Sequence, residues 1–189
     1  TREYTHKVFD STVDTLLKVR DSLMLENLEA AVAAICNAQR VEFYGFGASA
    51  AVAFDAQHKF FRLQITSAAY SDPHLQNMSA TSLHAGDVVV AISQSGRTKA
   101  LLDSMDLVKR AGGIVIGLAP SNSPIARKAD IAIEVNAKED IQIYTPLSSR
   151  IAHLAVLDVL AIGVAQKKGP QLEAHLQQLQ AGLASLRSD

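Results

Sequence analysis

The sequence predicts an α/β fold: a flavodoxin-like, doubly wound sheet of five parallel strands in the order 2-1-3-4-5, with flanking N- and C-terminal helices. Two observations lead to this prediction. Short apolar runs alternate with helical segments along the chain, which is typical of βαβ units. The runs, such as residues 88–92, are continuously apolar, as in strands covered on both faces. Right-handed crossovers between such strands favour the stated order, in which the chain reverses direction between the first and third strands.

Each element follows from a local pattern of apolar residues and turn residues. The expected helices cover residues 5–37 (with a break near Leu25), 48–63, 73–83, 99–111, 123–128, 148–167 and 171–186. The expected strands cover residues 41–44, 65–70, 87–92, 114–118 and 131–135. Pro73 suits a first helical turn, and Gly169-Pro170 separates the last two helices. We divide the chain into an N-terminal helical extension, residues 1–38, and an α/β domain with its C-terminal helix, residues 39–189.

Composition places the chain among globular proteins. Its 189 residues are 48% hydrophobic and 20% charged, which is enough to bury a full core. The net charge of -1 argues against a nucleic-acid-binding surface on this chain. The lone Cys36 permits no disulfide within the chain and fits the reducing cytoplasm. The sequence has neither a long uninterrupted apolar run nor a basic-then-apolar N-terminal signal, so we expect no membrane span.

A hydroxyl-rich turn stands between the third strand and the following helix, and it reads Ser93-Gln94-Ser95-Gly96-Arg97-Thr98. The first N–H groups of a helix lack internal partners and carry the positive end of its dipole, so they bind anions, most often phosphate. One capping serine would be enough to start a helix, whereas three hydroxyls cluster around a glycine here. Hydroxyls donate hydrogen bonds without a net charge. The turn therefore favours a phosphorylated small molecule.

The first strand is followed by a second candidate binding loop, Gly45-Phe46-Gly47-Ala48-Ser49. Its glycines allow a sharp turn and a close approach of the backbone to a ligand, although Ser49 could equally be an ordinary helix cap. The loop is not a dinucleotide fingerprint, because Ala50 stands where the third glycine belongs, and it is not a P-loop. The predicted strand order brings both loops to the carboxyl edge of the sheet, beside the switch point where ligands bind.

Taken together, the two loops resemble the SIS (sugar isomerase) domain, over about residues 41–164. The resemblance implies a flavodoxin-like fold, a homodimer, and phosphosugar binding at the Ser/Thr-rich turn. It also implies phosphate contacts from the hydroxyls of that turn and from the N–H groups of Gln94 and Gly96, with Ser49 facing them. The expected ligand-binding residues are Gly47, Ala48, Ser49, Ser93, Gln94, Ser95, Gly96, Arg97 and Thr98. We expect no catalytic residue, metal or cofactor.

Two classes of SIS domain compete: sugar-phosphate aldose–ketose isomerases, and the effector domains of RpiR-type transcription regulators. Isomerisation needs a base that moves a proton between adjacent sugar carbons. Such isomerases often carry a Glu directly after the Ser-Gly of the turn, or a Lys in the first loop, where this chain has Arg97 and Ala48. Glu139 and His58 are the acid–base candidates for the isomerase alternative. We favour the sensor, and a bare dimerisation module is a third hypothesis.

Further segments resemble the RpiR-type regulators of hexose metabolism, namely residues 55–62, 148–150 and 157–158. This resemblance implies a phosphorylated sugar acid as the effector, 2-keto-3-deoxy-6-phosphogluconate. It also implies that DNA is bound only through a helix-turn-helix domain that lies outside this chain, which would explain a chain that begins at Thr1.

Three charged residues have open roles. Arg97, beside the turn, could hold the carboxylate of a sugar acid in a fork of two hydrogen bonds, or could simply be solvated. Arg150 and Asp158, on an otherwise apolar helix, are expected to pair with each other or to line the dimer seam.

Overall fold

A single five-stranded sheet organises the computed structural model, which describes residues 2–137 and 147–184. All pairings are parallel and the strand order is β2-β1-β3-β4-β5, which confirms the predicted fold class. The strands are β1 Val41–Gly45, β2 Ser67–Tyr70, β3 Val88–Ile92, β4 Ile114–Ala119 and β5 Ile131–Glu134. The helices are α1 Arg2–Ser22, α2 Leu25–Asn37, α3 Ala48–Arg62, α4 Pro73–Thr81, α5 Lys99–Arg110, α6 Pro124–Lys128, α7 Ser148–Lys168 and α8 Pro170–Ala184.

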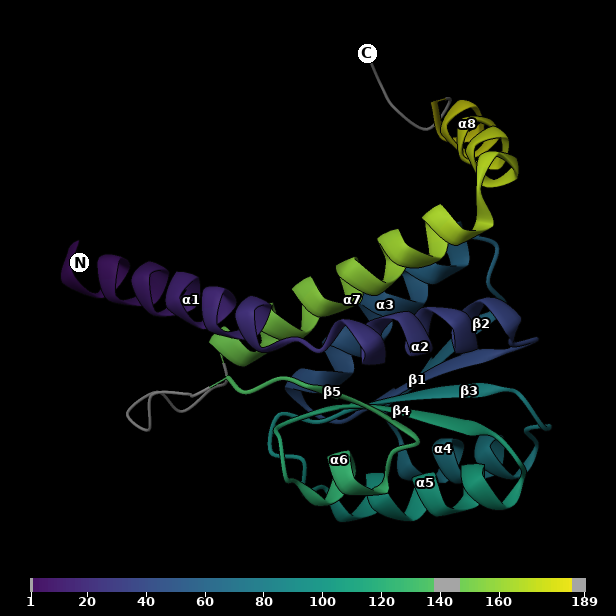
Figure 1. Ribbon diagram of the computed structural model, residues 1–189, viewed down its shortest axis with the longest axis horizontal. Helices are drawn as coiled ribbons and strands as arrows, with labels where there is room; N and C mark the ends of the chain where they lie inside the picture. The colour runs from purple at the N-terminus through teal and green to yellow at the C-terminus, as the bar shows by residue number, and fades with distance from the viewer. Residues whose placement is uncertain (1, 138–146, 185–189) are drawn as a thin grey trace.

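Helices cover both faces of the sheet (Figure 1), with α2, α3 and α7 on one face and α4, α5 and α6 on the other. Because side chains alternate along a strand, each central strand contributes to two cores. In β3, for example, Val88 and Val90 pack under α3 and α7, whereas Val89 and Ala91 pack against α4 and α5. This two-sided burial explains why the strands read as continuous apolar runs in the sequence.

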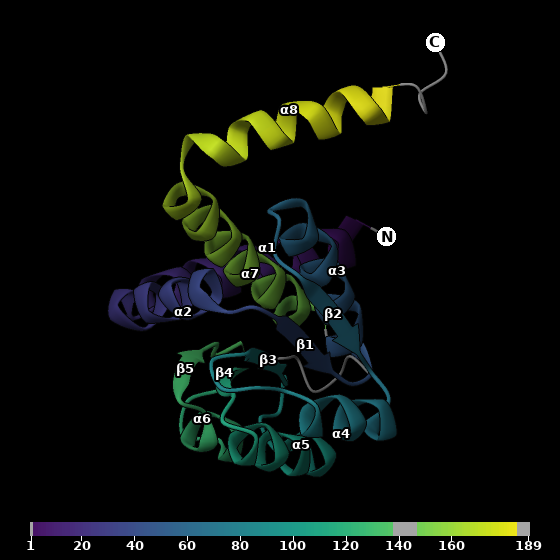
Figure 2. The same ribbon diagram turned by 90° about the vertical axis from the view of Figure 1, so that its right-hand side faces the viewer.

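Two helices reach away from the α/β body (Figures 1 and 2). Helix α1 extends beyond the sheet and α8 turns away from it after Gly169, so that Leu172 is the buried residue of the described part of α8. The break near Leu25 that the sequence predicts lies between α1 and α2, and α2 packs against α7 and β5.

Helix α7 is long and apolar enough to cross a membrane by length and composition, with a mean hydropathy of 1.5 over its most apolar window. Half of that window is buried in this structure, against α1, α2 and α3. Its apolar character is therefore that of a core helix.

The second strand is shorter than the sequence predicts, since it begins at Ser67 rather than at Ile65. The Ile65 N–H donates to the Phe60 carbonyl, and Gln64 adopts a left-handed φ of 57°, so both residues belong to the turn that ends α3. A local hydrogen bond thus outcompetes the β propensity of the isoleucine. At the other end of the chain, the predicted last helix runs to residue 186, of which the structure describes α8 up to Ala184.

Candidate functional site

The two loops singled out from the sequence meet at the carboxyl edge of the sheet. Strand register places Gly45 opposite Ile92, so the loop after β1 and the loop after β3 start side by side. They enclose a cavity of about 130 Å³. Its lining residues are Phe46, Ala48, Ser49, Ile92, Ser93, Gln94, Ser95 and Thr98. The two loops are neighbours because the strands before them, β1 and β3, are adjacent in the sheet, as the sequence predicts.

The hydroxyls of the second loop form hydrogen bonds within the turn itself. The Ser93 hydroxyl, which is buried, accepts the Gly96 N–H at 3.0 Å and lies 3.2 Å from Thr98 Oγ1. The Ser95 hydroxyl accepts the Arg97 N–H at 3.3 Å. Thr98 precedes the first residue of α5, yet its side chain makes no capping hydrogen bond. These contacts stabilise the conformation of the turn, of which Ser93, Gln94, Ser95 and Thr98 line the cavity. The expected phosphate contact of the Gly96 N–H would have to replace its bond to Ser93.

Gly96 also joins this turn to the start of α6. It has a left-handed φ of 63°, and its carbonyl accepts the Ile125 N–H at 3.1 Å. A Cβ at Gly96 would stand 2.3 Å from the Ser123 side chain, which caps α6 by accepting the Ala126 N–H at 3.2 Å. The glycine is required here both for the backbone conformation and for the close approach.

The first loop places Ser49 in a helix rather than at its cap. Gly47, with a φ of 55°, precedes Ala48, where α3 begins, so Ser49 lies inside the first turn and is not the helix cap. Ser49 is 8% exposed and lines the cavity. A Cβ on Gly45 would stand 2.5 Å from the Ser49 carbonyl oxygen. The close approach of β1 to this turn thus requires a glycine at the end of the strand.

Six of the nine expected ligand-binding residues line this cavity, and three do not. Gly47 and Gly96 have positive φ values and belong to the two turns without lining the cavity. Arg97 is exposed and lies outside the lining. Of the acid–base candidates, His58 is exposed on α3, and Glu139 lies outside the described residues. The cavity lining named above contains no carboxylate.

The expected pairing of Arg150 with Asp158 is not what the structure shows. Asp158 instead forms an ion pair with Lys59 of α3, whose Nζ also lies 2.7 Å from Asp55 Oδ2. Arg150 and Asp158 are eight residues apart on α7, which is more than two helical turns and too far for a direct ion pair. The packing of α3 on α7 instead brings Lys59 to Asp158. This contact ties the helix that carries Ser49 to α7.

Sequence reasoning missed the contribution of α7 to the site. A small second cavity, of about 10 Å³, borders the first one and shares Ala48, Ser49 and Gln94 with it. Its other lining residues are Val52, Ser149, Arg150 and His153. A signal existed in the sequence, since polar residues at 148–150 and 153 interrupt an otherwise apolar helix. Only the packing of α7 on α3 shows which loop they face.

His153 is the most unusual of these residues because it is a buried imidazole, 1% exposed. Among the residues that the structure describes, none forms a hydrogen bond with its Nε2 atom. Burial lowers the pKa of His153 to about 4, because a charged imidazolium would lose its hydration. The side chain is therefore neutral at pH 7.

This lowered pKa predicts an acid-labile contribution to stability. The unfolded chain binds the proton with an ordinary pKa near 6.5, more tightly than the folded protein does. We therefore expect the contribution of His153 to be complete above about pH 6.5 and to fall by about 3 kcal/mol as the pH is lowered to about 4. Urea unfolding of the wild type and of His153→Gln across this range gives the difference directly. The exposed His84, replaced in the same way, is the control; equal pH slopes in the wild type and both variants would contradict the prediction.

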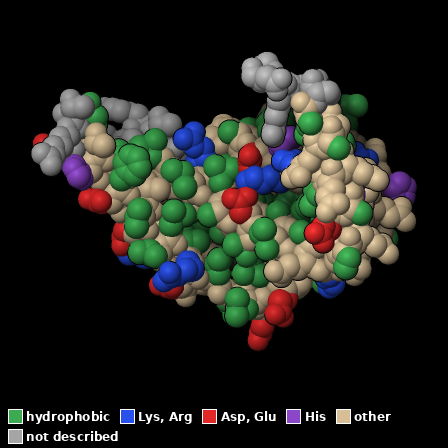
Figure 3. Space-filling view, turned by 90° about the horizontal axis from the view of Figure 1, so that it is seen from above, with side chains coloured by type: hydrophobic (Ala, Val, Ile, Leu, Met, Phe, Trp, Pro, Cys, Tyr) green, Lys and Arg blue, Asp and Glu red, His purple; other side chains and the backbone are tan. Residues whose placement is uncertain are grey.

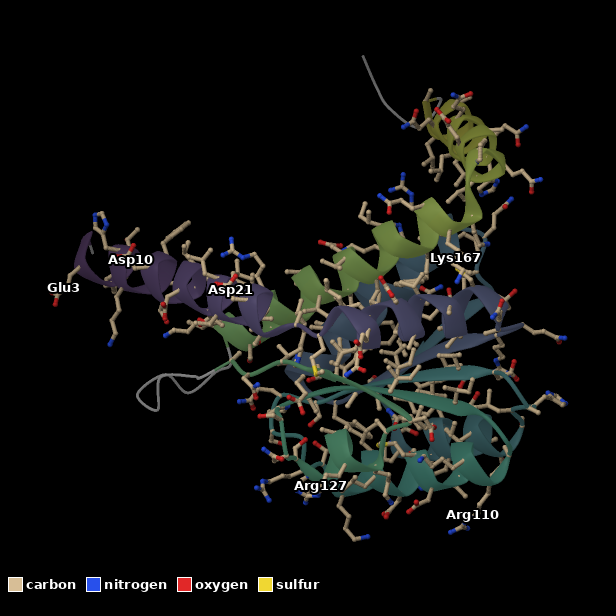
Figure 4. All side chains as sticks on the ribbon, in the orientation of Figure 1. Glu3, Asp10, Asp21, Arg110, Arg127 and Lys167 are labelled. Carbon is tan, nitrogen blue, oxygen red and sulfur yellow. The ribbon has the colours of Figure 1, made fainter. Side chains whose placement is uncertain are left out.

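Basic side chains away from the site are dispersed. Figure 4 labels Arg110, Arg127 and Lys167, which belong to three separate elements, α5, α6 and α7. Several other lysines are paired, such as Lys128 with Asp106 at 2.6 Å and Lys109 with Asp130 at 2.9 Å. This dispersion agrees with the net charge of -1.

The fold and the paired loops define an α/β domain with a hydroxyl-rich turn at its switch point. A family model, the SIS domain, matches residues 34–163, and the chain belongs to this family.

Two relatives carry the comparison further. The chain is 39% identical over 184 residues to the HTH-type transcriptional regulator HexR of Pseudomonas aeruginosa, covering 97% of this chain and 65% of that protein. It is 43% identical over 166 residues to the bifunctional protein glk of Burkholderia thailandensis, covering 88% of this chain and 26% of that protein. The first of these relatives confirms the resemblance to the HexR regulators. The chain spans only part of the length of either relative.

A solved structure has the same fold. The sugar isomerase domain of an RpiR transcription factor from Sphaerobacter thermophilus superimposes with a TM-score of 0.83 at 25% identity, covering 93% of this chain and 97% of that one. The similarity thus covers nearly the whole of this chain.

Proposed function

We propose that this chain is the effector-sensing SIS domain of a transcriptional regulator of the HexR type, and that it binds a phosphorylated sugar acid such as 2-keto-3-deoxy-6-phosphogluconate. The observation that most directly supports this proposal is the cavity between the two loops. Hydroxyl groups from two elements far apart in the sequence line it, and the N-terminus of α5 starts at its edge. Converging hydroxyls at the positive end of a helix suit a phosphate ester.

The relatives support a regulatory role. The Pseudomonas aeruginosa protein is by name a helix-turn-helix regulator, and this chain covers 65% of it. In our proposal, DNA contact belongs to a helix-turn-helix domain outside residues 1–189, and the complete regulator acts in the cytoplasm. Residues 1–38 serve as the helical connection to that domain.

We further propose that the domain works as a homodimer, in which the ligand shifts the relation of the two subunits. Figure 3 shows apolar side chains gathered across the face that carries α1 and α7. The exposed large apolar side chains of α1 and α7 include Val8, Phe9, Val13, Leu17, Val159 and Ile162. An apolar surface of this kind is typical of a protein–protein interface. Binding can move the subunits only through its different affinity for the two arrangements.

Replacing Ser49 or Ser93 with alanine is the direct test of the phosphate site. Each change removes a hydroxyl that lines the cavity, and a hydrogen bond to a charged group contributes about 1.5–3 kcal/mol. We therefore expect the affinity for 2-keto-3-deoxy-6-phosphogluconate to fall by about 10- to 100-fold in isothermal titration. Ser82→Ala, whose hydroxyl bonds to the Met78 carbonyl on α4, is the control. Unchanged affinity in both variants would refute the site.

The isomerase alternative predicts turnover. Incubating the chain with sugar phosphates and following ketose formation tests it, and Glu139→Gln should abolish any activity found. The sensor proposal expects no turnover above the uncatalysed rate. Genuine turnover that Glu139→Gln removes would overturn the proposal in favour of the enzyme.

A further inference from the structure

Helix α7 supplies a second wall to the ligand site. Arg150 and His153 stand one turn apart on this helix, and both line the small cavity that shares Ala48, Ser49 and Gln94 with the larger one. A ligand whose phosphate lies on the hydroxyl-rich turn would therefore extend toward α7.

His153 offers a hydrogen-bonding atom at this wall. Its Nε2 is buried and has no hydrogen-bond partner among the described residues, which is an unfavourable arrangement for a native side chain. The adjoining space of about 10 Å³ is roughly that of a single water-sized group. One oxygen atom of a bound molecule would satisfy the imidazole there.

Arg150 offers the positive charge. It is exposed and lies on the rim of the small cavity, and none of the salt bridges among the described residues includes it. Among the described residues, those that line the two cavities include this one cation and no carboxylate. Arg97, considered from the sequence for the same role, lines neither cavity. A guanidinium matches a carboxylate through two parallel hydrogen bonds.

We propose that Arg150 and His153 determine the specificity of the site: Arg150 pairs with the carboxylate of a phosphorylated sugar acid, and His153 forms a hydrogen bond with one further oxygen of the same molecule. This inference rests on the proposed function, because the phosphate must first bind at the hydroxyl-rich turn. It names the residues that distinguish a sugar acid phosphate from a neutral sugar phosphate.

The test compares two open-chain probes that differ only at one end, 6-phosphogluconate with its carboxylate and glucitol 6-phosphate with a hydroxymethyl group. We expect the wild type to prefer the acid by about 10- to 100-fold in isothermal titration, as the loss of a charged hydrogen-bonded contact predicts. Arg150→Gln should reduce that preference to less than about threefold and leave the affinity for glucitol 6-phosphate nearly unchanged. Arg62→Gln, at the exposed far end of α3, changes the net charge equally and should retain the preference.

His153 is tested by a pair of substitutions. His153→Leu should weaken the binding of both probes by about tenfold, whereas His153→Gln, which keeps a polar group at a similar reach, should restore most of the affinity. Melting temperatures report whether each variant is folded. Equal losses in both variants would overturn the hydrogen bond that we assign to this residue.

The outcomes separate the two proposals. If neither probe nor 2-keto-3-deoxy-6-phosphogluconate binds the wild type, the proposed function fails and this inference fails with it. If Ser49→Ala weakens both probes but the wild type shows no preference for the acid, or if Arg150→Gln retains the preference, the phosphate site stands and the inference about Arg150 is wrong.

Discussion

Replacing Glu42 with alanine is expected to lower the free energy of unfolding by about 3 kcal/mol, at the lower end of what the loss of one partner of a buried ion pair costs. Glu42 is fully buried in β1, on the face that packs against α4. It is an exception in a strand that is otherwise apolar or aromatic, and its carboxylate is the centre of a hydrogen-bonded network. Removing it would leave buried donors without an acceptor.

Each oxygen of the Glu42 carboxylate is occupied. Oε2 accepts the Tyr44 hydroxyl at 2.6 Å, and Oε1 accepts the Ser79 hydroxyl at 2.6 Å. Arg40 forms an ion pair with the same carboxylate and donates to Ser79 Oγ at 2.8 Å. Burial and the neighbouring Glu42 charge raise the pKa of Tyr44, so its hydroxyl stays protonated and remains a donor. Arg40 is about one-third exposed and can turn to water, which is why we expect the lower end of the range.

Urea unfolding measures this effect as a lower midpoint at an unchanged slope. Glu42→Gln keeps the shape and one acceptor oxygen, so its loss should be smaller than that of Glu42→Ala. Glu173→Ala removes an exposed carboxylate on α8 and is the matched control, with an expected change within about 0.5 kcal/mol. A Glu42→Ala midpoint no lower than that of Glu173→Ala would show that the network contributes nothing net.

The substitution Gly96→Ala is expected to destabilise the fold and to distort the hydroxyl-rich turn. The added Cβ meets a left-handed φ of 63° and a Ser123 side chain 2.3 Å away. Left-handed backbone costs a non-glycine residue about 1 kcal/mol, and overpacking adds about 1–3 kcal/mol. The Gly96 carbonyl also accepts the Ile125 N–H, so a shift that relieves the clash would displace the hydroxyl-rich turn. We expect a total loss of about 2–4 kcal/mol in stability and a loss of detectable phosphosugar binding.

Gly86→Ala is the control for this prediction. Gly86 lies in an exposed turn with a φ of 87° and has no atom within 4 Å of where a Cβ would stand, so that variant should lose only the conformational part, about 1 kcal/mol. In the double variant Gly96→Ala/Ser123→Gly the clashing side chain is gone. A double-mutant cycle by urea unfolding should then give a positive coupling of about 1 kcal/mol or more. Equal destabilisation by Gly96→Ala and Gly86→Ala would rule out the clash.

Much of the fold could be predicted because its signals are local. The apolar run at residues 88–92 indicates a buried strand, and the glycines in the loops after the first and third strands indicate turns. Chirality then leaves few ways to connect parallel strands, so the order β2-β1-β3-β4-β5 followed from the alternation of strand and helix. The same predicted order places the loop of Ser49 beside the loop of Ser93.

The sequence by itself determined the sheet, its strand order and the meeting of the two hydroxyl-bearing loops, because periodicity, turn residues and handedness are properties of short segments. Only the tertiary structure decided which face of α7 meets Ser49, that Asp158 pairs with Lys59 rather than with Arg150, and that Glu42 is buried with three donors around it. Those outcomes depend on the rotation and packing of elements distant in the chain. A pattern of residue types along one helix or strand does not encode which partner the rest of the fold brings to it.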